Sequence, residues 1–306
     1  MQPALTVEHV KKRYGARLAV DDLSFDAPPG AIVGVLGPNG AGKSTTLRMI
    51  VGVLKPDAGS IAVLGRAPRM GGLPRVGYLP EERGLYRSMT PLGLIIYFAR
   101  LKGVSFSEAK RRGLALLEQH GLGEWAHRKV KTLSKGMAQK VQLLAVIAHD
   151  PDLLLLDEPF SGLDPVNQRA VEDLIRDAAA RGKTVLFSTH VMEHAERMCD
   201  RIVLIARGKS VFQGTVSQAL SLTPRVAHLE TDGAFDLAAA LAPSGFVAAL
   251  EEQGEGVRRW RVGLSASEDS RRLLAACVAA GAPLSLYEPQ RASLHDAFVR
   301  LVGGEA

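Results

Sequence analysis

The sequence is poor in cysteine, in aromatic residues and in long apolar runs. Its 306 residues include two cysteines, Cys199 and Cys277, and 5% aromatic residues. Two cysteines so far apart form neither a zinc-ligand spacing nor a disulfide framework, which fits a reducing cytosol. We therefore expect both to be small buried hydrophobic residues.

No apolar run in the sequence is long enough to span a bilayer. The longest notable runs, Leu92–Ala99 and Leu153–Leu156, fall far short of the roughly 20 residues that a membrane helix needs. The first residues also lack a charged stretch followed by an apolar one, so we expect no signal peptide. We expect a soluble chain that would need a partner to hold it at a membrane.

Charge is distributed unevenly along the chain. Residues 223–306 contain eight arginines, no lysine and eleven acidic residues, a net charge of −3, whereas residues 1–222 carry +9. The basic part has no Lys/Arg stripe with interleaved aromatic residues, so we expect no nucleic-acid partner. The change of composition near Pro224 predicts two domains, 1–222 and 223–306.

The stretch 37–45 matches the phosphate-loop pattern G-x-x-x-x-G-K-[ST] at every fixed position. It lies between a predicted buried strand, 31–36, and a predicted helix, 43–53. Glycines let backbone N–H groups turn toward phosphate oxygens, and the helix N-terminus adds partial positive charge. Lys43 would reach the β- and γ-phosphates of ATP, and Ser44 would place its hydroxyl on Mg²⁺. The predicted nucleotide-binding residues here are Gly37, Pro38, Asn39, Gly40, Ala41, Gly42, Lys43, Ser44 and Thr45.

An uninterrupted apolar run, 153–156, is followed by two adjacent carboxylates, Asp157 and Glu158. Buried charges must be paired or bind metal, so these two side chains indicate a functional site. We expect Asp157 to hold Mg²⁺ through water and Glu158 to orient an attacking water molecule.

Three further residues are candidates on weaker patterns. His190 follows a predicted strand, 184–188, at the sheet edge where α/β proteins bind ligands. Tyr14 precedes the loop by about two strands, and stacking on adenine or packing at a strand end are equally good interpretations. Ser134 is placed to cap a helix running to about residue 149.

With these pieces in order, residues 1–220 resemble the ATP-binding subunit of an ATP-binding-cassette (ABC) transporter. Tyr14 matches the family's adenine-stacking position, Leu153–Asp157 its Walker B strand and Ser161–Asp164 its D-loop. Leu133–Met137 stands where the family has its L-S-G-G-Q signature, so Ser134 and Gly136 are implied nucleotide-binding residues. The resemblance also implies that Glu158, His190 and Lys43 are catalytic.

Three residues depart from the family pattern. Lys135 replaces a signature glycine and Met137 its glutamine, while Glu81 stands at the usual Q-loop glutamine and is implied as a metal-side residue with Ser44 and Asp157. Exporter-type subfamilies that resemble sodium or antibiotic exporters carry a similar stretch to Pro80–Tyr86.

The resemblance implies a P-loop NTPase α/β core with a β-sheet subdomain and a helical insertion at about 82–150. It further implies ATP and Mg²⁺ as ligands, and head-to-tail pairing with a second copy or a related subunit. Integral membrane permease subunits would hold the protein on the cytoplasmic face of the membrane. The alternative from another class is a soluble ABC ATPase acting on nucleic acid or ribosomes, but the chain has one cassette, no sustained heptads and no zinc cysteines.

After residue 224 the predicted elements follow the order β-α-β-β-α-β with one extra helix, which is typical of a ferredoxin-like α+β fold. No His, Cys or carboxylate cluster with metal or catalytic spacing occurs there. We therefore expect a regulatory or interaction domain.

Overall fold

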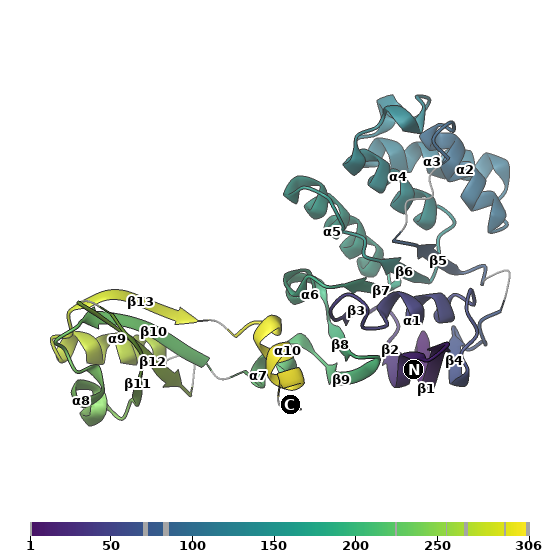
Figure 1. The fold of residues 1–306 in the computed structure, drawn as a ribbon. Helices are drawn as coiled ribbons and strands as arrows, with labels where there is room; N and C mark the ends of the chain where they lie inside the picture. Colours follow the sequence, from purple (N-terminus) through teal and green to yellow (C-terminus); the bar gives the residue numbers. More distant parts are fainter. Residues whose placement is uncertain are drawn as a thin grey trace. The chain divides into compact units, whose positions relative to one another are not determined.

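The computed structural model describes residues 2–69, 73–81, 86–223, 225–254, 256–265, 269–290 and 292–303. The chain divides into two compact units, Met1–Val216 and Ser217–Ala306 (Figure 1). Residues 82–85, at the start of the expected helical insertion, lie outside the described residues.

A six-stranded sheet forms the centre of the first unit. Five neighbouring strands are parallel, and the strand at one edge runs antiparallel. The inner strands are continuous apolar runs because both faces of the sheet are covered. The spatial order is β5 (Val76–Leu79), β6 (Leu153–Asp157), β7 (Thr184–Thr189), β3 (Ile32–Leu36), β8 (Arg201–Ala206) and β9 (Lys209–Gly214).

The first unit also contains a second sheet, which is antiparallel and packs together with helix α1 and the six-stranded sheet. Its strands are β2 (Arg17–Ala27), β1 (Leu5–Tyr14) and β4 (Ala58–Val63), and the helix is α1 (Lys43–Ile50). Apolar side chains from both sheets and from α1 form one buried cluster. This packing fixes the start of α1 against the carboxyl end of β3.

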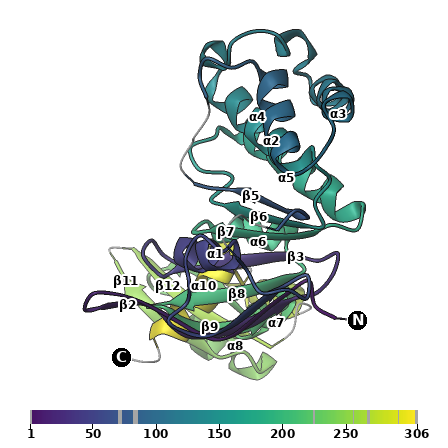
Figure 2. The same ribbon diagram turned by 90° about the vertical axis from the view of Figure 1, so that its right-hand side faces the viewer.

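A helical part gathers beyond the β5 edge of the sheet in both views (Figures 1 and 2). Its helices begin at side-chain caps, with Thr90, Ser105 and Ser134 each accepting a backbone N–H three residues on. It comprises α2 (Pro91–Leu101), α3 (Phe106–Gln119), α4 (Lys135–Ile147) and the 3₁₀ turns η1 (Gly123–Trp125) and η2 (Val130–Thr132).

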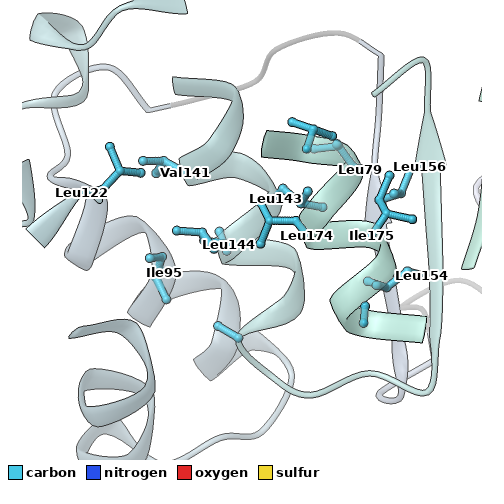
Figure 3. Packing of buried hydrophobic residues seen from close by; sticks show 14 of the residues in the cluster. Leu79, Ile95, Leu122, Val141, Leu143, Leu144, Leu154, Leu156, Leu174 and Ile175 are labelled. Carbon is cyan, nitrogen blue, oxygen red and sulfur yellow. The ribbon is translucent and has the colours of Figure 1, made fainter. Parts of the chain in front are cut away.

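Apolar side chains of these helices share a core with β5, β6 and two further helices, α5 (Pro165–Ala180) and α6 (Met192–Met198). Figure 3 labels part of this cluster, with Leu143 and Leu144 of α4 near Leu174 of α5. The shared core attaches the start of α4 to the sheet that carries the strand-end carboxylates.

The second unit contains an antiparallel sheet in the order β11-β12-β10-β13, as a ferredoxin-like fold requires, which confirms the predicted topology. Its core includes Trp260, whose indole N–H donates to Thr231 Oγ1 at 2.9 Å. The elements are α7 (Val216–Ser221), β10 (Arg225–Asp232), α8 (Leu237–Leu241), η3 (Ala242–Ser244), β11 (Ala248–Gln253), β12 (Val257–Leu264), α9 (Asp269–Ala279), β13 (Leu284–Gln290) and α10 (Leu294–Gly303).

Two sequence predictions of local structure were wrong. The helix predicted to reach Val53 ends at Ile50, because Gly52 takes a left-handed conformation with φ 77° just after the last turn. The composition of residues 55–60, Lys-Pro-Asp-Ala-Gly-Ser, predicts a turn, but the segment is partly strand, since β4 begins at Ala58 and pairs with β1. Pairing between distant segments overrode the local turn composition there.

The cysteines follow the expectation only in part. Cys277 is buried and Cys199 is half-buried, and burial raises the pKa of both thiols. Among the described residues, no helix is long and apolar enough to cross a membrane.

His149 gives the first unit a built-in acid sensitivity. It follows α4 with its Nε2 buried and without a partner, and burial, helped by the charge of Lys102, lowers its pKa to about 4. A folded-state pKa below the ordinary value of 6.5 means that the unfolded chain binds the proton more readily. Stability from this group is therefore present above pH 6.5 and is lost as the pH falls toward 4.

We expect His149→Gln to reduce the loss of stability between pH 7 and pH 5, by up to about 1.4 kcal/mol per pH unit. Urea denaturation at the two pH values measures this difference. The exposed His127 supplies the control, because His127→Gln makes the same change at a side chain that lies in solvent. An unaltered pH dependence in His149→Gln would contradict the assignment.

Candidate functional site

The predicted site residues meet at one edge of the six-stranded sheet. Gly37 follows β3, His190 follows β7, Asp157 ends β6 and Glu158 comes directly after it. Glu81 comes two residues after β5. Because these four strands are parallel neighbours, their carboxyl ends lie side by side, where open α/β sheets bind ligands.

Neighbouring backbone atoms lie so close to Gly37 and Gly42 of the loop that neither position has room for a side chain. A Cβ on Gly37 would lie 2.1 Å from the carbonyl oxygen of Ile205. A Cβ on Gly42 would lie 2.6 Å from the oxygen of Ala19, and its φ of 109° disfavours other residues. The side chain of Ala41 is 3% exposed and joins the core, so only its backbone is available to a ligand.

The ammonium of Lys43 lies inside the loop. Its Nζ donates to the carbonyl oxygens of Gly37 at 2.8 Å and Pro38 at 3.2 Å, and lies 3.5 Å from Glu158 Oε1. The residue is 5% exposed. The first N–H groups of α1 have no acceptor within the helix, so they and this ammonium form a cationic site for phosphate.

Asp157 connects the loop to the neighbouring strands. Its Oδ1 accepts hydrogen bonds from Ser44 Oγ at 3.1 Å and Ser188 Oγ at 2.6 Å. Asp157 is only 1% exposed, and its Oδ2 is buried without a protein partner. A buried carboxylate oxygen of this kind requires a cation or water.

Glu158 has an unusual backbone conformation for a residue with a side chain. Its φ of 47° lies in the left-handed region, which costs free energy and recurs at functional sites. Its N–H donates to Ser188 Oγ at 3.0 Å, which offsets part of that cost. The carboxylate is 8% exposed and lies 3.0 Å from His190 Nδ1.

A pocket of about 610 Å³ brings most of the predicted nucleotide-binding residues together. The predicted residues that line it are Tyr14, Asn39, Gly40, Gly42, Lys43, Ser44, Thr45, Glu81 and Glu158. Tyr14 is 46% exposed, so its ring is accessible at the pocket as the stacking interpretation requires. The same pocket spans the loop and Glu158, whereas Asp157 is not among its lining residues.

The signature segment lies apart from this pocket. Ser134 caps α4 by accepting the N–H of Met137 at 3.2 Å, and Gly136 is buried in the first turn. Lys135 is exposed, and Met137 packs against the core of the helical part. The two departures from the family pattern therefore fall on a solvent-facing position and a core-facing one.

Sequence reasoning missed several residues at the site. Arg17 and Arg48 line the pocket, and Arg17 Nη2 donates to the oxygen of Gly40 at 3.3 Å. Gln139 Nε2 donates to the oxygen of Pro159 at 3.0 Å, joining α4 to the segment after Glu158. No local pattern marks these residues, because each meets its partner only through the fold.

A buried polar cluster supports the segment that follows Glu158. The ring of His194 stacks on Phe160 with centroids 4.2 Å apart, and its Nδ1 lies 3.2 Å from Glu172 Oε1. Arg197 Nη2 donates to the same oxygen at 2.5 Å. Burial lowers the pKa of His194, and the contact with Glu172 opposes this shift.

Comparison with known proteins decides the family. The family model for ABC transporters matches residues 20–161. An uncharacterized ABC transporter ATP-binding protein, YhaQ of Bacillus subtilis, is 38% identical over 300 residues, covering 98% of each chain. This chain belongs to the ABC transporter family, as an ATP-binding subunit. A Nod factor export ATP-binding protein I of Burkholderia orbicola is 36% identical, over 97% of this chain and 96% of its own.

Solved structures agree with this family assignment. The structure of an ATP-binding subunit of an ABC transporter is similar with a TM-score of 0.65 at 32% identity, over 71% of this chain and 92% of that one. A nucleotide-free ATP-binding cassette has a TM-score of 0.63 at 21% identity, over 70% of this chain and 92% of that chain, which supports the fold alone. The expected ABC ATPase fold and subunit assignment are thus confirmed, and the chain is an ATP-hydrolysing subunit of an ABC transporter.

We expect Lys43→Ala to lower ATP affinity about 10- to 100-fold, the usual effect of losing a hydrogen bond to a charged group. Hydrolysis should fall with it, because the ammonium is the buried cation of the loop. Titration with a fluorescent ATP analogue measures affinity, and phosphate release measures turnover. Lys110→Ala, at an exposed position of α3, serves as the control. Unchanged values in Lys43→Ala would mean that the loop is misassigned.

Proposed function

We propose that this subunit hydrolyses Mg²⁺-ATP in a head-to-tail dimer and that this reaction drives an exporter. The observation that carries the proposal is one hydrogen-bonded network across the sheet edge. Ser44 is bonded to Asp157, Asp157 to Ser188, and Ser188 to the backbone of Glu158. Glu158 in turn contacts His190. The phosphate loop and the two strand-end carboxylates are thereby held in fixed relation.

The residues at this edge fit a Mg²⁺ ion. Mg²⁺ is usually bound through one or two carboxylates, waters and the phosphates of the substrate. Asp157 offers a buried, unpartnered Oδ2, and Ser44 lies next to it. When bound, Mg²⁺ would neutralise charge on the phosphate oxygens.

Glu158 is proposed as the group that orients and deprotonates the attacking water. It is nearly buried, lies 3.0 Å from His190 Nδ1 and 3.5 Å from Lys43 Nζ. The Glu158 carboxylate would accept the proton from the attacking water. His190 would hold this carboxylate in place. Lys43 and the loop N–H groups would bind the phosphates.

The position of the signature supports a dimer. Ser134 and Gly136 begin α4 in the helical part, whereas the loop of the same copy begins α1. The family resemblance implies that each signature covers the nucleotide of a second copy or of a related subunit. Residues 1–222 would form this cassette, and residues 223–306 a regulatory or interaction domain.

The proposed partners are integral membrane permease subunits that hold the protein at the cytoplasmic face of the membrane. Support for export comes from the names of relatives, which include Nod factor export and linearmycin resistance ATP-binding proteins. Affinity purification from detergent-solubilised membranes tests this part. Recovery of a multi-helix membrane protein supports it, and recovery of nucleic acid or ribosomes instead would favour the alternative ATPase class.

We expect Glu158→Gln to keep ATP binding and to lose about 10²- to 10⁴-fold in turnover, as removal of a general base does. The variant should accumulate as an ATP-bound dimer, which gel filtration with ATP detects. ADP provides the control, because it lacks the γ-phosphate that the signature would cover. Unimpaired hydrolysis, or a monomer at saturating ATP, would contradict the proposed mechanism.

Glu81 is proposed as a metal-side residue, because it is a carboxylate that lines the nucleotide pocket. We expect Glu81→Ala to raise the Mg²⁺ concentration for half-maximal ATPase activity and to weaken stimulation by the permease. Glu81→Gln should stay within several-fold of wild type, since an amide oxygen is also a hard ligand. The exposed Glu124 gives the control variant, Glu124→Ala. A Mg²⁺ titration in which Glu81→Ala matches wild type would remove this residue from the site.

A further inference from the structure

Gly136, at the start of α4, is in unusually close contact with a residue of α5. A Cβ built on Gly136 would lie 2.3 Å from Asn167 Cγ, 2.4 Å from its Nδ2 and 2.5 Å from its Oδ1. The whole carboxamide of Asn167 therefore covers the α-carbon of Gly136. No side chain larger than hydrogen fits at this position while Asn167 stays in place.

Asn167 is held in this position by Asp164, the last residue before α5. Its backbone N–H donates to Asp164 Oδ1 at 3.0 Å, and its Nδ2 donates to Asp164 Oδ2 at 2.6 Å. Both hydrogen bonds lower the pKa of Asp164, and the one from the backbone N–H contributes most. The carboxylate thus fixes the Asn167 side chain in the orientation that meets Gly136.

This contact explains why one signature glycine is replaced and the other is present. Lys135 is exposed, so a side chain there meets solvent. Gly136 is buried under Asn167. The requirement for glycine at residue 136 comes from a neighbour within the same copy.

We propose that Asn167 is a positioning residue that joins the start of α4 to the Asp164 loop, so that the signature and the segment after Glu158 move together. Glu158 precedes Asp164 by only six residues. Binding of the partner's nucleotide at Ser134 would in this way be communicated to the carboxylate of the same copy. The inference rests on the proposed dimer, in which the start of α4 faces the partner's nucleotide.

The test is a double-mutant cycle in the full chain carrying Glu158→Gln, with Gly136→Ala, Asn167→Ala and both changes together. Gel filtration at increasing ATP gives the protein concentration for half-maximal dimerisation, fluorescent ADP gives the nucleotide affinity of each copy, and thermal melting gives stability. Asn167→Ala should raise the dimerisation concentration about tenfold, in the range of couplings between touching side chains. Its ADP affinity should stay within about twofold, because the phosphate loop is untouched.

Gly136→Ala alone should impair dimerisation more than Asn167→Ala, because its new methyl group meets the carboxamide. Adding Asn167→Ala to Gly136→Ala should restore dimerisation to the level of Asn167→Ala alone, and should likewise raise the melting temperature. Alanine has a higher helix propensity than glycine, so helix propensity does not oppose this change. A double variant no better than Gly136→Ala would overturn the inference.

Gln168 supplies the matched control. Gln168 lies on the same turn of α5 as Asn167, and its Nε2 donates to the backbone oxygen of Leu163 at 3.1 Å. The atoms nearest to a Cβ on Gly136 belong to Asn167 and not to Gln168. Gln168→Ala should leave ATP-driven dimerisation as in the Glu158→Gln parent, and an equal loss would show a general effect of disturbing this loop and overturn the inference.

Two failures remain distinguishable. If the Glu158→Gln parent never dimerises with ATP, the proposed dimer fails and the inference fails with it. If the parent dimerises and Asn167→Ala does so equally well, only the role of Asn167 is refuted. The same change can be tested by ATPase kinetics in the chain with Glu158 intact. There Asn167→Ala should lower the Hill coefficient for ATP toward 1 and retain the ADP affinity. Loss of a purely structural contact would not change the Hill coefficient in this way.

Discussion

The structure of the site depends on a buried carboxylate at the end of β6. Asp157 is almost fully removed from solvent, and a charge in such an environment is costly unless hydrogen bonds or a cation compensate it. Two hydroxyl groups, from Ser44 and Ser188, stabilise one oxygen, and the other oxygen is free for a ligand. The apolar strands around Asp157 provide the low-dielectric surroundings that make its interactions strong.

The neighbouring Glu158 is held by the same set of bonds. Its left-handed backbone would be unfavourable by itself, and the hydrogen bond from its N–H to Ser188 helps to stabilise it. This conformation turns the chain away from the strand direction immediately after Asp157. The consequence is that two adjacent carboxylates have different partners. Asp157 is bonded to the hydroxyls of Ser44 and Ser188, and Glu158 contacts Lys43 and His190.

The helical part connects to this edge at several points that follow Glu158 in the chain. Gln139 of α4 reaches the oxygen of Pro159, and Asn167 of α5 covers Gly136. The stack of His194 on Phe160 supports the same segment from α6. The sheet edge and the start of α4 are therefore both in contact with one short stretch of chain, residues 158–167.

The sequence by itself determined the local features of this protein. The phosphate loop, the apolar strand followed by Asp157 and Glu158, and the helix start at Ser134 were predicted because each depends on adjacent residues or on short periodicity. The ferredoxin-like order of the second unit followed from the same patterns. The helix predicted at 43–53 was too long, because it included Gly52, whose left-handed conformation follows the end of α1 at Ile50.

Tertiary structure decided which of these features meet. Ser44 and Asp157 are 113 residues apart in the chain, and His190 and Glu158 are 32 apart, so their contacts depend on the order of parallel strands. The cover of Asn167 over Gly136 depends on how α5 packs against α4, for which single residues carry no local signal. Strand order and helix packing arise from burial of large apolar surfaces summed over the whole unit, and no short stretch of sequence encodes that sum.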